Sequence, residues 1–111
     1  MPRPSRAKAA DLDALIEEAI VDANDEHEQV TGFYEMLDQH LSIPFQAKVV
    51  GEKVTITGVD VEETELVALC MRKGRKYRIA LLSVECPGDI PGGEWLAAYR
   101  KFRSHGAGGG G

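Results

Sequence analysis

Apolar side chains recur every three or four residues through the first third of the chain, a spacing that predicts amphipathic helices. One run covers residues 12–23 and a second covers residues 30–41. We interpret them as two helices or one bent helix. The join is expected near Thr31 and Gly32, because glycine and β-branched residues are poor helix formers. Pro44 ends the helical part, since proline disfavours helix in the residue before it.

Beyond residue 44 the apolar positions alternate with polar ones, as is typical of β-strands. Residues 45–50 and 53–57 form two such segments, and Gly51 and Glu52 mark the turn between them. Gly58 is expected to close the second strand, since glycine weakens a strand interior. The sequence therefore predicts a first pair of short strands directly after the helices.

Two further apolar runs and a closing helix follow. Residues 65–72 and 76–82 are predicted as strands, and residues 73–75 join them as a hairpin with glycine where a positive φ is needed. Residues 87–93 are expected to form a loop. Residues 94–102 place their aromatic and leucine side chains on one stripe, which predicts a short amphipathic helix.

This order of elements defines an α+β fold: N-terminal acidic helices packed on a small antiparallel sheet or barrel of about four to five strands, with a short C-terminal helix. With 111 residues and 43% hydrophobic content, the chain can bury one core. We expect a disordered arm over residues 1–10, a single domain over residues 11–103 and a flexible Gly-rich tail over residues 104–111.

Composition also bears on the compartment. No apolar run approaches the roughly 20 residues that cross a bilayer, and residues 1–10 lack the apolar core of a signal peptide. The two cysteines, Cys70 and Cys86, are too few for a disulfide framework and are expected to be reduced, with Cys86 the more exposed. We therefore expect a cytoplasmic protein without membrane contact.

The net charge of −5 conceals a strong asymmetry. Residues 11–40 contain ten carboxylates and no Lys or Arg, a local charge of −10. The remainder holds all 13 basic residues against the other 8 of the 18 acidic ones, a net +5. An acidic face of this kind repels nucleic acid phosphates and attracts cations or a basic partner.

The acidic segment suggests calcium, a hard cation that takes six to eight oxygen ligands. Side chains three or four residues apart share a helix face. One acidic stripe contains Asp22, Asp25 and Glu26, with Gln29 adding an amide oxygen, and a second contains Glu28, Glu35 and Asp38. The second stripe requires that the helix continue through Gly32. The candidate ligands are Asp22, Asp25, Glu26, Glu28, Glu35 and Asp38.

A solvated acidic helix face is the alternative interpretation of these charges. Solvated helices usually intersperse Lys with Glu and gain pair energy, whereas this segment omits basic residues altogether. No stretch has the spacing of an EF-hand loop. A site here would be built on helices and a loop.

The pattern as a whole resembles the small bacterial calcium-binding protein family first recognised in cyanobacteria, the CcbP-like proteins. Members carry a VDAY-like acidic helix, a glycine-aromatic-aromatic segment and a Pro-Phe-x-Ala strand entry. The matching positions here are Ile20, Val21, Asp22, Ala23, Asp25, Glu26, Glu28, Gln29, Gly32, Phe33, Tyr34, Leu37, Leu41, Pro44, Phe45, Ala47 and Lys48. The resemblance extends from about residue 15 to residue 102.

The resemblance implies calcium binding by surface carboxylates, buffering or sensing of cytosolic calcium, and no catalytic activity. A regulatory protein partner would accompany the sensing role. The chain departs from the pattern at Asn24, where a tyrosine is expected, and at His27, where an acidic residue is expected. Asn24 can itself offer an amide oxygen.

The main alternative is a small barrel-like module that binds nucleic acid or protein through the basic hairpin 72–78, in which Tyr77 lies among five Lys and Arg residues. The acidic pI of about 5.1 disfavours nucleic acid. An enzyme is disfavoured because His27 and His40 have no Ser or Cys nucleophile pattern near them.

Overall fold

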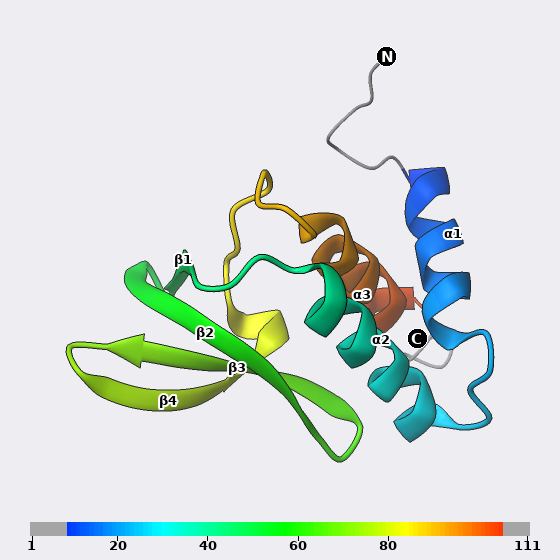
Figure 1. Ribbon diagram of the computed structural model, residues 1–111, viewed down its shortest axis with the longest axis horizontal. Helices are drawn as coiled ribbons and strands as arrows, with labels where there is room; N and C mark the ends of the chain where they lie inside the picture. The colour runs from blue at the N-terminus through cyan, green and yellow to red at the C-terminus, as the bar shows by residue number, and fades with distance from the viewer. Residues whose placement is uncertain (1–8, 106–111) are drawn as a thin grey trace.

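The computed structural model describes residues 9–105 of the chain (Figure 1). The elements follow one another as α1 (Ala9–Ile20), α2 (Glu26–His40), β1 (Phe45–Val49), β2 (Glu52–Glu62), β3 (Glu65–Arg72), β4 (Arg75–Ala80), a 3-10 helix (Leu81–Ser83) and α3 (Gly93–His105). Helix α1 thus begins before the expected domain boundary at residue 11, and α3 continues past residue 103. The rest of the expected arm and tail lies outside the described residues.

The first two helices are separate, but the predicted position of their join is wrong. Helix α2 runs without interruption through Thr31 and Gly32, and the break lies between Ile20 and Glu26. Asp25 caps α2, its carboxylate accepting a hydrogen bond from Glu28 N at 2.9 Å. A side chain that satisfies a free N–H at the start of a helix fixes that start, and this signal outweighs the low helix propensity of glycine.

Gly32 serves helix packing rather than helix termination. A Cβ atom added at this position would lie 2.0 Å from the carbonyl oxygen of Ala19 in α1. The backbones of α1 and α2 therefore approach more closely here than any other residue type allows.

The four strands form one antiparallel sheet in the order β1-β2-β3-β4. β3 covers the predicted residues, whereas β2 continues to Glu62 instead of closing at Gly58. A register shift between Ile56 and Gly58 marks a β-bulge there, and bulges bend a strand without ending it. β4 ends at Ala80, earlier than predicted, because the chain turns into the 3-10 helix.

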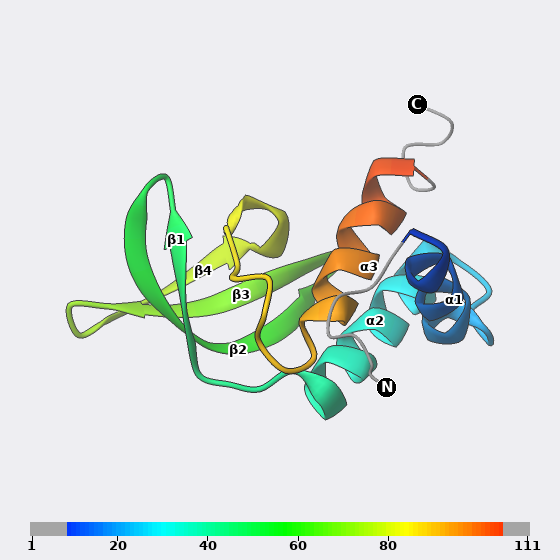
Figure 2. The ribbon, with the colours of Figure 1, turned by 90° about the horizontal axis from the view of Figure 1, so that it is seen from above.

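Within residues 9–105 the sheet is open rather than a closed barrel. After the 3-10 helix the chain crosses to the free edge of β1 (Figure 2), where Lys48 N donates to Glu85 O at 3.0 Å and Glu85 N donates to Lys48 O at 2.8 Å. This single bridge covers the β1 edge. Among the described strands, β4 has only β3 as a neighbour. The predicted α+β class is confirmed.

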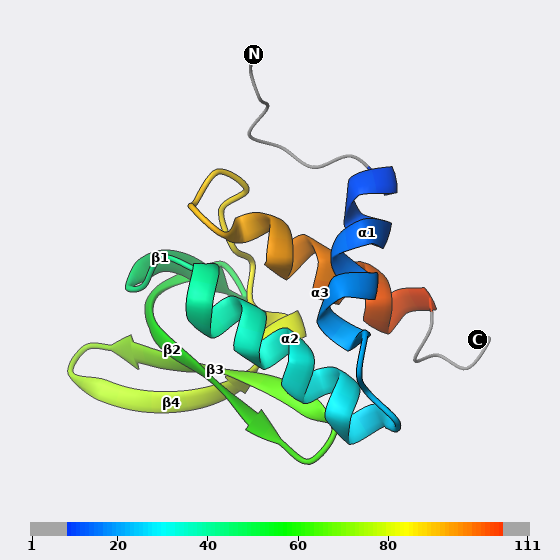
Figure 3. The ribbon, with the colours of Figure 1, turned by 45° about the vertical axis from the view of Figure 1, so that its right-hand side comes forward.

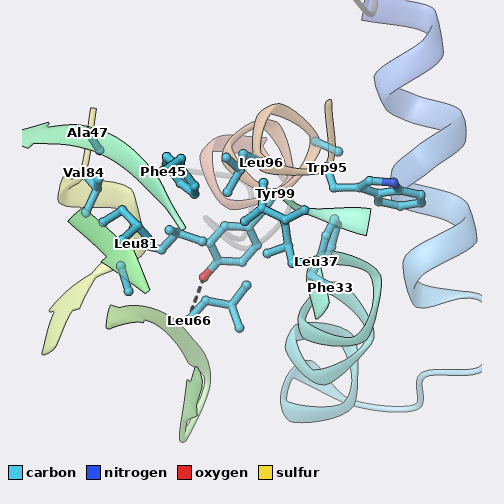
Figure 4. Packing of buried hydrophobic residues seen from close by; sticks show 14 of the residues in the cluster. Phe33, Leu37, Phe45, Ala47, Leu66, Leu81, Val84, Trp95, Leu96 and Tyr99 are labelled. Carbon is cyan, nitrogen blue, oxygen red and sulfur yellow. Dashed lines mark hydrogen bonds between the residues drawn. The ribbon is translucent and has the colours of Figure 1, made fainter. Parts of the chain in front are cut away.

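The core lies between the sheet and the helices. Helix α2 packs on β2 and β3, and α1 contacts α2 and α3 on the side away from the sheet (Figures 1 and 3). Tyr99 is fully buried; its ring packs edge-on against Phe33 at 5.5 Å, and its hydroxyl accepts a hydrogen bond from Leu66 N at 3.1 Å (Figure 4). One side chain of α3 thus joins α2 to β3, and these contacts hold α2 in place on the sheet.

Candidate calcium site

A depression of ≈ 630 Å³ lies where the end of α1, the connecting segment and residues 27–36 of α2 meet. None of its lining residues is a Lys or Arg. Its polar lining is formed by Glu18, Asp22, Asn24, His27, Glu28, Thr31 and Glu35. The depression exists because α2 begins only at Glu26, which leaves the segment before it to fold over the helix face.

Three of the six predicted ligands, Asp22, Glu28 and Glu35, line this depression. Asp22 comes from the connecting segment, and the other two are seven residues apart on α2. Two turns of helix separate such positions, so they share one face. One carboxylate oxygen of Glu28 accepts a hydrogen bond from Asn24 N at 2.7 Å, which holds the connecting segment against α2.

The other three predicted ligands have different environments. The Asp25 carboxylate caps α2. Glu26 pairs with Arg103 of α3, with Oε2 and Nη1 3.1 Å apart. Asp38 lies near the other end of α2, in a separate depression that Tyr34 and Thr57 also line.

Sequence reasoning did not assign Glu18 to the site, although its spacing contained the signal. Glu18 is four residues before Asp22, the separation at which side chains share a helix face. The residues that carry the family resemblance begin only at Ile20, so the resemblance did not draw attention to Glu18. Asn24, noted only as a departure from the family pattern, also lines the depression.

Two cations of α3 reach the acidic helices from the far end of the sequence. Besides the Arg103 pair, Lys101 Nζ lies 2.8 Å from Asp13 Oδ1. The side chain of Lys101 is 25% exposed and that of Arg103 is 20% exposed. Salt therefore screens these two ion pairs less than it screens fully exposed pairs. The acidic helices are thus partly neutralised along α3, away from the residues that line the depression.

The donor chemistry of the depression fits calcium, but its acidic side chains form no close cluster among the described residues. Carboxylate and amide oxygens are the protein ligands that calcium prefers. In the described part of the chain no three His, Cys, Asp or Glu side chains form a group that could hold a metal ion by themselves. Calcium also accepts water ligands and irregular geometry, so a site on Asp22, Glu28 and Glu35 would require water to complete the shell.

Neither of the two cysteines lines the depression. Both cysteines are free, Cys70 buried and Cys86 half-buried, as the sequence predicted for their relative exposure. Burial raises the pKa of each thiol, which keeps it protonated and weakly reactive near neutral pH.

Comparison with known proteins shows which family and which solved structures the chain resembles. The model of the CcbP family, described as calcium binding, matches residues 13–89. The crystal structure of Anabaena CcbP superposes with a TM-score of 0.74 at 24% identity, over 94% of this chain and 98% of that one. The structure of a calcium binding protein in the calcium-binding form superposes with a TM-score of 0.70 at 23% sequence identity, over 84% of this chain and 89% of that one. No curated protein matches.

The chain belongs to the CcbP family of calcium-binding proteins. The family match covers more than half of the chain, and the two structures support the same fold. Calcium, predicted from the sequence, is confirmed as the ligand that defines the family. The family is one of binding proteins and not of enzymes. Over the described residues no helix is long and apolar enough to cross a membrane.

Proposed function

We propose that the depression between α1, the connecting segment and α2 is the calcium site, and that the protein buffers or senses calcium in the cytosol. The observation that carries the proposal is the meeting of Asp22, Glu28 and Glu35 in one depression that no Lys or Arg lines. Carboxylates that line one depression repel one another. A divalent cation between them removes that repulsion.

An open surface site of this kind favours moderate affinity. No preformed loop encloses the ion, and much of its shell is water, so the Kd is expected between micromolar and millimolar. Such affinity suits a protein that takes up calcium when its concentration rises. The cytosol is supported by the two free thiols, since disulfides form and persist mainly in oxidising compartments.

The test is calorimetric titration of calcium into chelator-treated protein, comparing two variants of equal charge. Asp22→Asn with Glu35→Gln removes two lining carboxylates and leaves Glu28, which holds the connecting segment. Glu17→Gln with Glu63→Gln removes two exposed carboxylates elsewhere. The first pair is expected to weaken binding at least about tenfold and the second less than about twofold, because only the first removes direct ligands.

Thermal unfolding gives an independent measurement. An ion that binds only the folded state stabilises it by about 2.7 kcal/mol at a hundredfold excess over Kd. Calcium is expected to raise the Tm more than magnesium does, because magnesium demands octahedral geometry and releases water reluctantly. Equal shifts with the two ions would show diffuse screening of the acidic helices and contradict the site.

The wider predicted set is tested separately. Asp25→Asn keeps a capping side chain while removing its charge, and Glu26→Gln and Asp38→Asn remove carboxylates outside the depression. Each is expected to change affinity by less than about threefold through long-range charge alone. A tenfold loss for any of them would move the site towards that residue.

A further inference from the structure

β4 is the open edge of the sheet. Among the described residues it pairs only with β3, and the hairpin of these two strands projects away from the helices, at the end of the molecule opposite α1 (Figures 1 and 3). A two-residue turn, Lys73 at φ 53° and Gly74 at φ 77°, closes the hairpin. Two positive φ values in a two-residue turn are typical of the tight turns that fix hairpin register.

This register determines which backbone groups of β4 remain available. Arg72 and Arg75 are the closing pair, and the pairing continues through Cys70 with Tyr77. Hydrogen-bonded and non-hydrogen-bonded pairs alternate in an antiparallel ladder. The N–H and C=O groups of Lys76, Arg78 and Ala80 therefore point away from β3, towards the open edge. An unpaired row of this kind is a template for one more strand.

The side chains along the edge are cationic at one end and partly apolar beside it. Lys73, Arg75 and Lys76 are exposed, and no hydrogen bond or ion pair within residues 9–105 engages their side chains. Tyr77 is 40% exposed. Ile79 lies two residues further on the same face of the strand, half-buried.

We propose that β4 is a docking edge for an acidic, extended segment of a partner protein, which adds to the sheet as a fifth strand. Backbone hydrogen bonds to Lys76 and Arg78 would supply affinity. Lys76 lies on the opposite face of β4 from Tyr77 and Ile79. The alternation of side chains would therefore place carboxylates of the segment against Lys76 on one face and apolar side chains beside Tyr77 and Ile79 on the other. The docking edge is remote from the calcium site and is independent of it.

Two other occupants fit less well. A nucleic acid would meet Arg78 already bound to Asp60 at 3.1 Å and Glu62 at 2.7 Å, and these carboxylates repel phosphates. The net charge of −5 adds to that repulsion. A second copy that pairs antiparallel through its own β4, centred on Tyr77, would place Lys76 opposite Arg78 on both sides of the axis, and like charges opposite each other are destabilising.

Cations on an edge strand also protect it against self-association. Protection requires charge alone, however, and does not require an exposed tyrosine among the charges. Tyrosine is enriched at protein interfaces, where its ring supplies apolar area. The combination at β4 therefore favours recognition over mere protection.

The experiment uses the full chain and a fluorescein-labelled, end-blocked peptide of alternating glutamate and valine, in chelator so that the peptide binds no calcium. Arg75→Glu with Lys76→Glu reverses two cations of the docking edge. Lys48→Glu with Lys53→Glu makes the same change in net charge on the β1–β2 hairpin. Fluorescence anisotropy is expected to show about tenfold weaker binding for the first pair and less than about twofold change for the second.

Amide hydrogen exchange separates strand addition from charge attraction. The peptide is expected to slow exchange of the Lys76 and Arg78 amides, which the free protein leaves unpaired. Absence of binding, or equal losses for the two variant pairs, would overturn the proposal. So would binding without amide protection that oligoglutamate or single-stranded oligothymidylate reproduces, since that result indicates a cationic surface without strand pairing.

Discussion

Gly32 controls how closely the two acidic helices approach, and through them the shape of the proposed calcium site. Replacing it with alanine would be expected to stabilise the protein on helix propensity alone, by about 1 kcal/mol. The structure predicts the opposite sign. The added Cβ would meet a backbone oxygen of Ala19 at 2.0 Å, which no side-chain rotation can relieve.

The Gly32→Ala variant is therefore expected to lose about 1–3 kcal/mol of unfolding free energy, the usual cost of overpacking, and to bind calcium more weakly because α1 is displaced from α2. Urea denaturation and calorimetry measure the two effects. Gly88→Ala is the matched control, since a Cβ there meets nothing within 4 Å. A stabilised Gly32→Ala protein would contradict the close approach.

At the scale of elements, Tyr99 connects α3 with β3. Its hydroxyl satisfies the N–H of Leu66, and both residues are fully buried. Tyr99→Phe leaves that N–H without its partner, which is expected to cost about 1–3 kcal/mol in urea denaturation. Tyr77→Phe, at an exposed position, is expected to change stability by less than about 0.5 kcal/mol. Equal effects would argue against the buried hydrogen bond.

The same residue gives a pH dependence. Burial raises the pKa of Tyr99, so the folded protein holds this proton more tightly than the unfolded chain. The associated stability is present below the unfolded pKa of about 10 and is lost as pH rises above it. Because burial also raises the pKa of Cys70 and Cys86, the decline starts near pH 8.5. The Tyr99→Phe variant is expected to keep the loss of stability that comes from the two thiols and to lack the further loss of stability above pH 10.

Periodicity predicted the elements well but not where they end. The helical and alternating patterns reflect which face of each element is buried, a local property of the sequence. The glycines misled because each serves a contact: Gly32 lies against Ala19, and Gly58 lies at the bulge of β2, where its missing Cβ leaves room for Leu69. A single sequence shows that a glycine is present but not which backbone or side chain it faces.

The candidate site shows the same limit. The i, i+7 relation of Glu28 and Glu35 could be predicted because both are on one helix. That Asp22 folds over them depends on the cap at Asp25, which the sequence contained as an Asn-Asp pair before the helix. The partner of Glu26 could not be found, because Arg103 is 77 residues away and reaches it only through tertiary packing.

At the scale of the whole molecule, charge is separated between two ends. The depression with its carboxylates lies at the α1–α2 end, and the exposed cations of the β3–β4 hairpin lie at the other (Figure 1). Between them, α3 brings Lys101 and Arg103 to the acidic helices. These two pairs stabilise the calcium-free protein and at the same time lower the negative charge of the helices that carry the proposed calcium site. Stability without calcium and affinity for calcium are therefore opposed.

Arg103→Gln tests this opposition. The variant loses the pair with Glu26 and the hydrogen bond to Thr64 O at 3.0 Å, so its Tm without calcium is expected to fall. Its calcium affinity is expected to rise by up to about twofold at 0.1 M salt, because the acidic helices lose a neutralising cation while salt screens much of the effect. Lys73→Gln makes the same change in net charge at the tip of the distant hairpin and is expected to leave affinity nearly unchanged, because salt screens charges over about 10 Å. Calorimetry of both variants at 0.1 M salt decides the question: equal gains would mean that only net charge matters, and no gain for Arg103→Gln would mean that its pair with Glu26 does not oppose calcium.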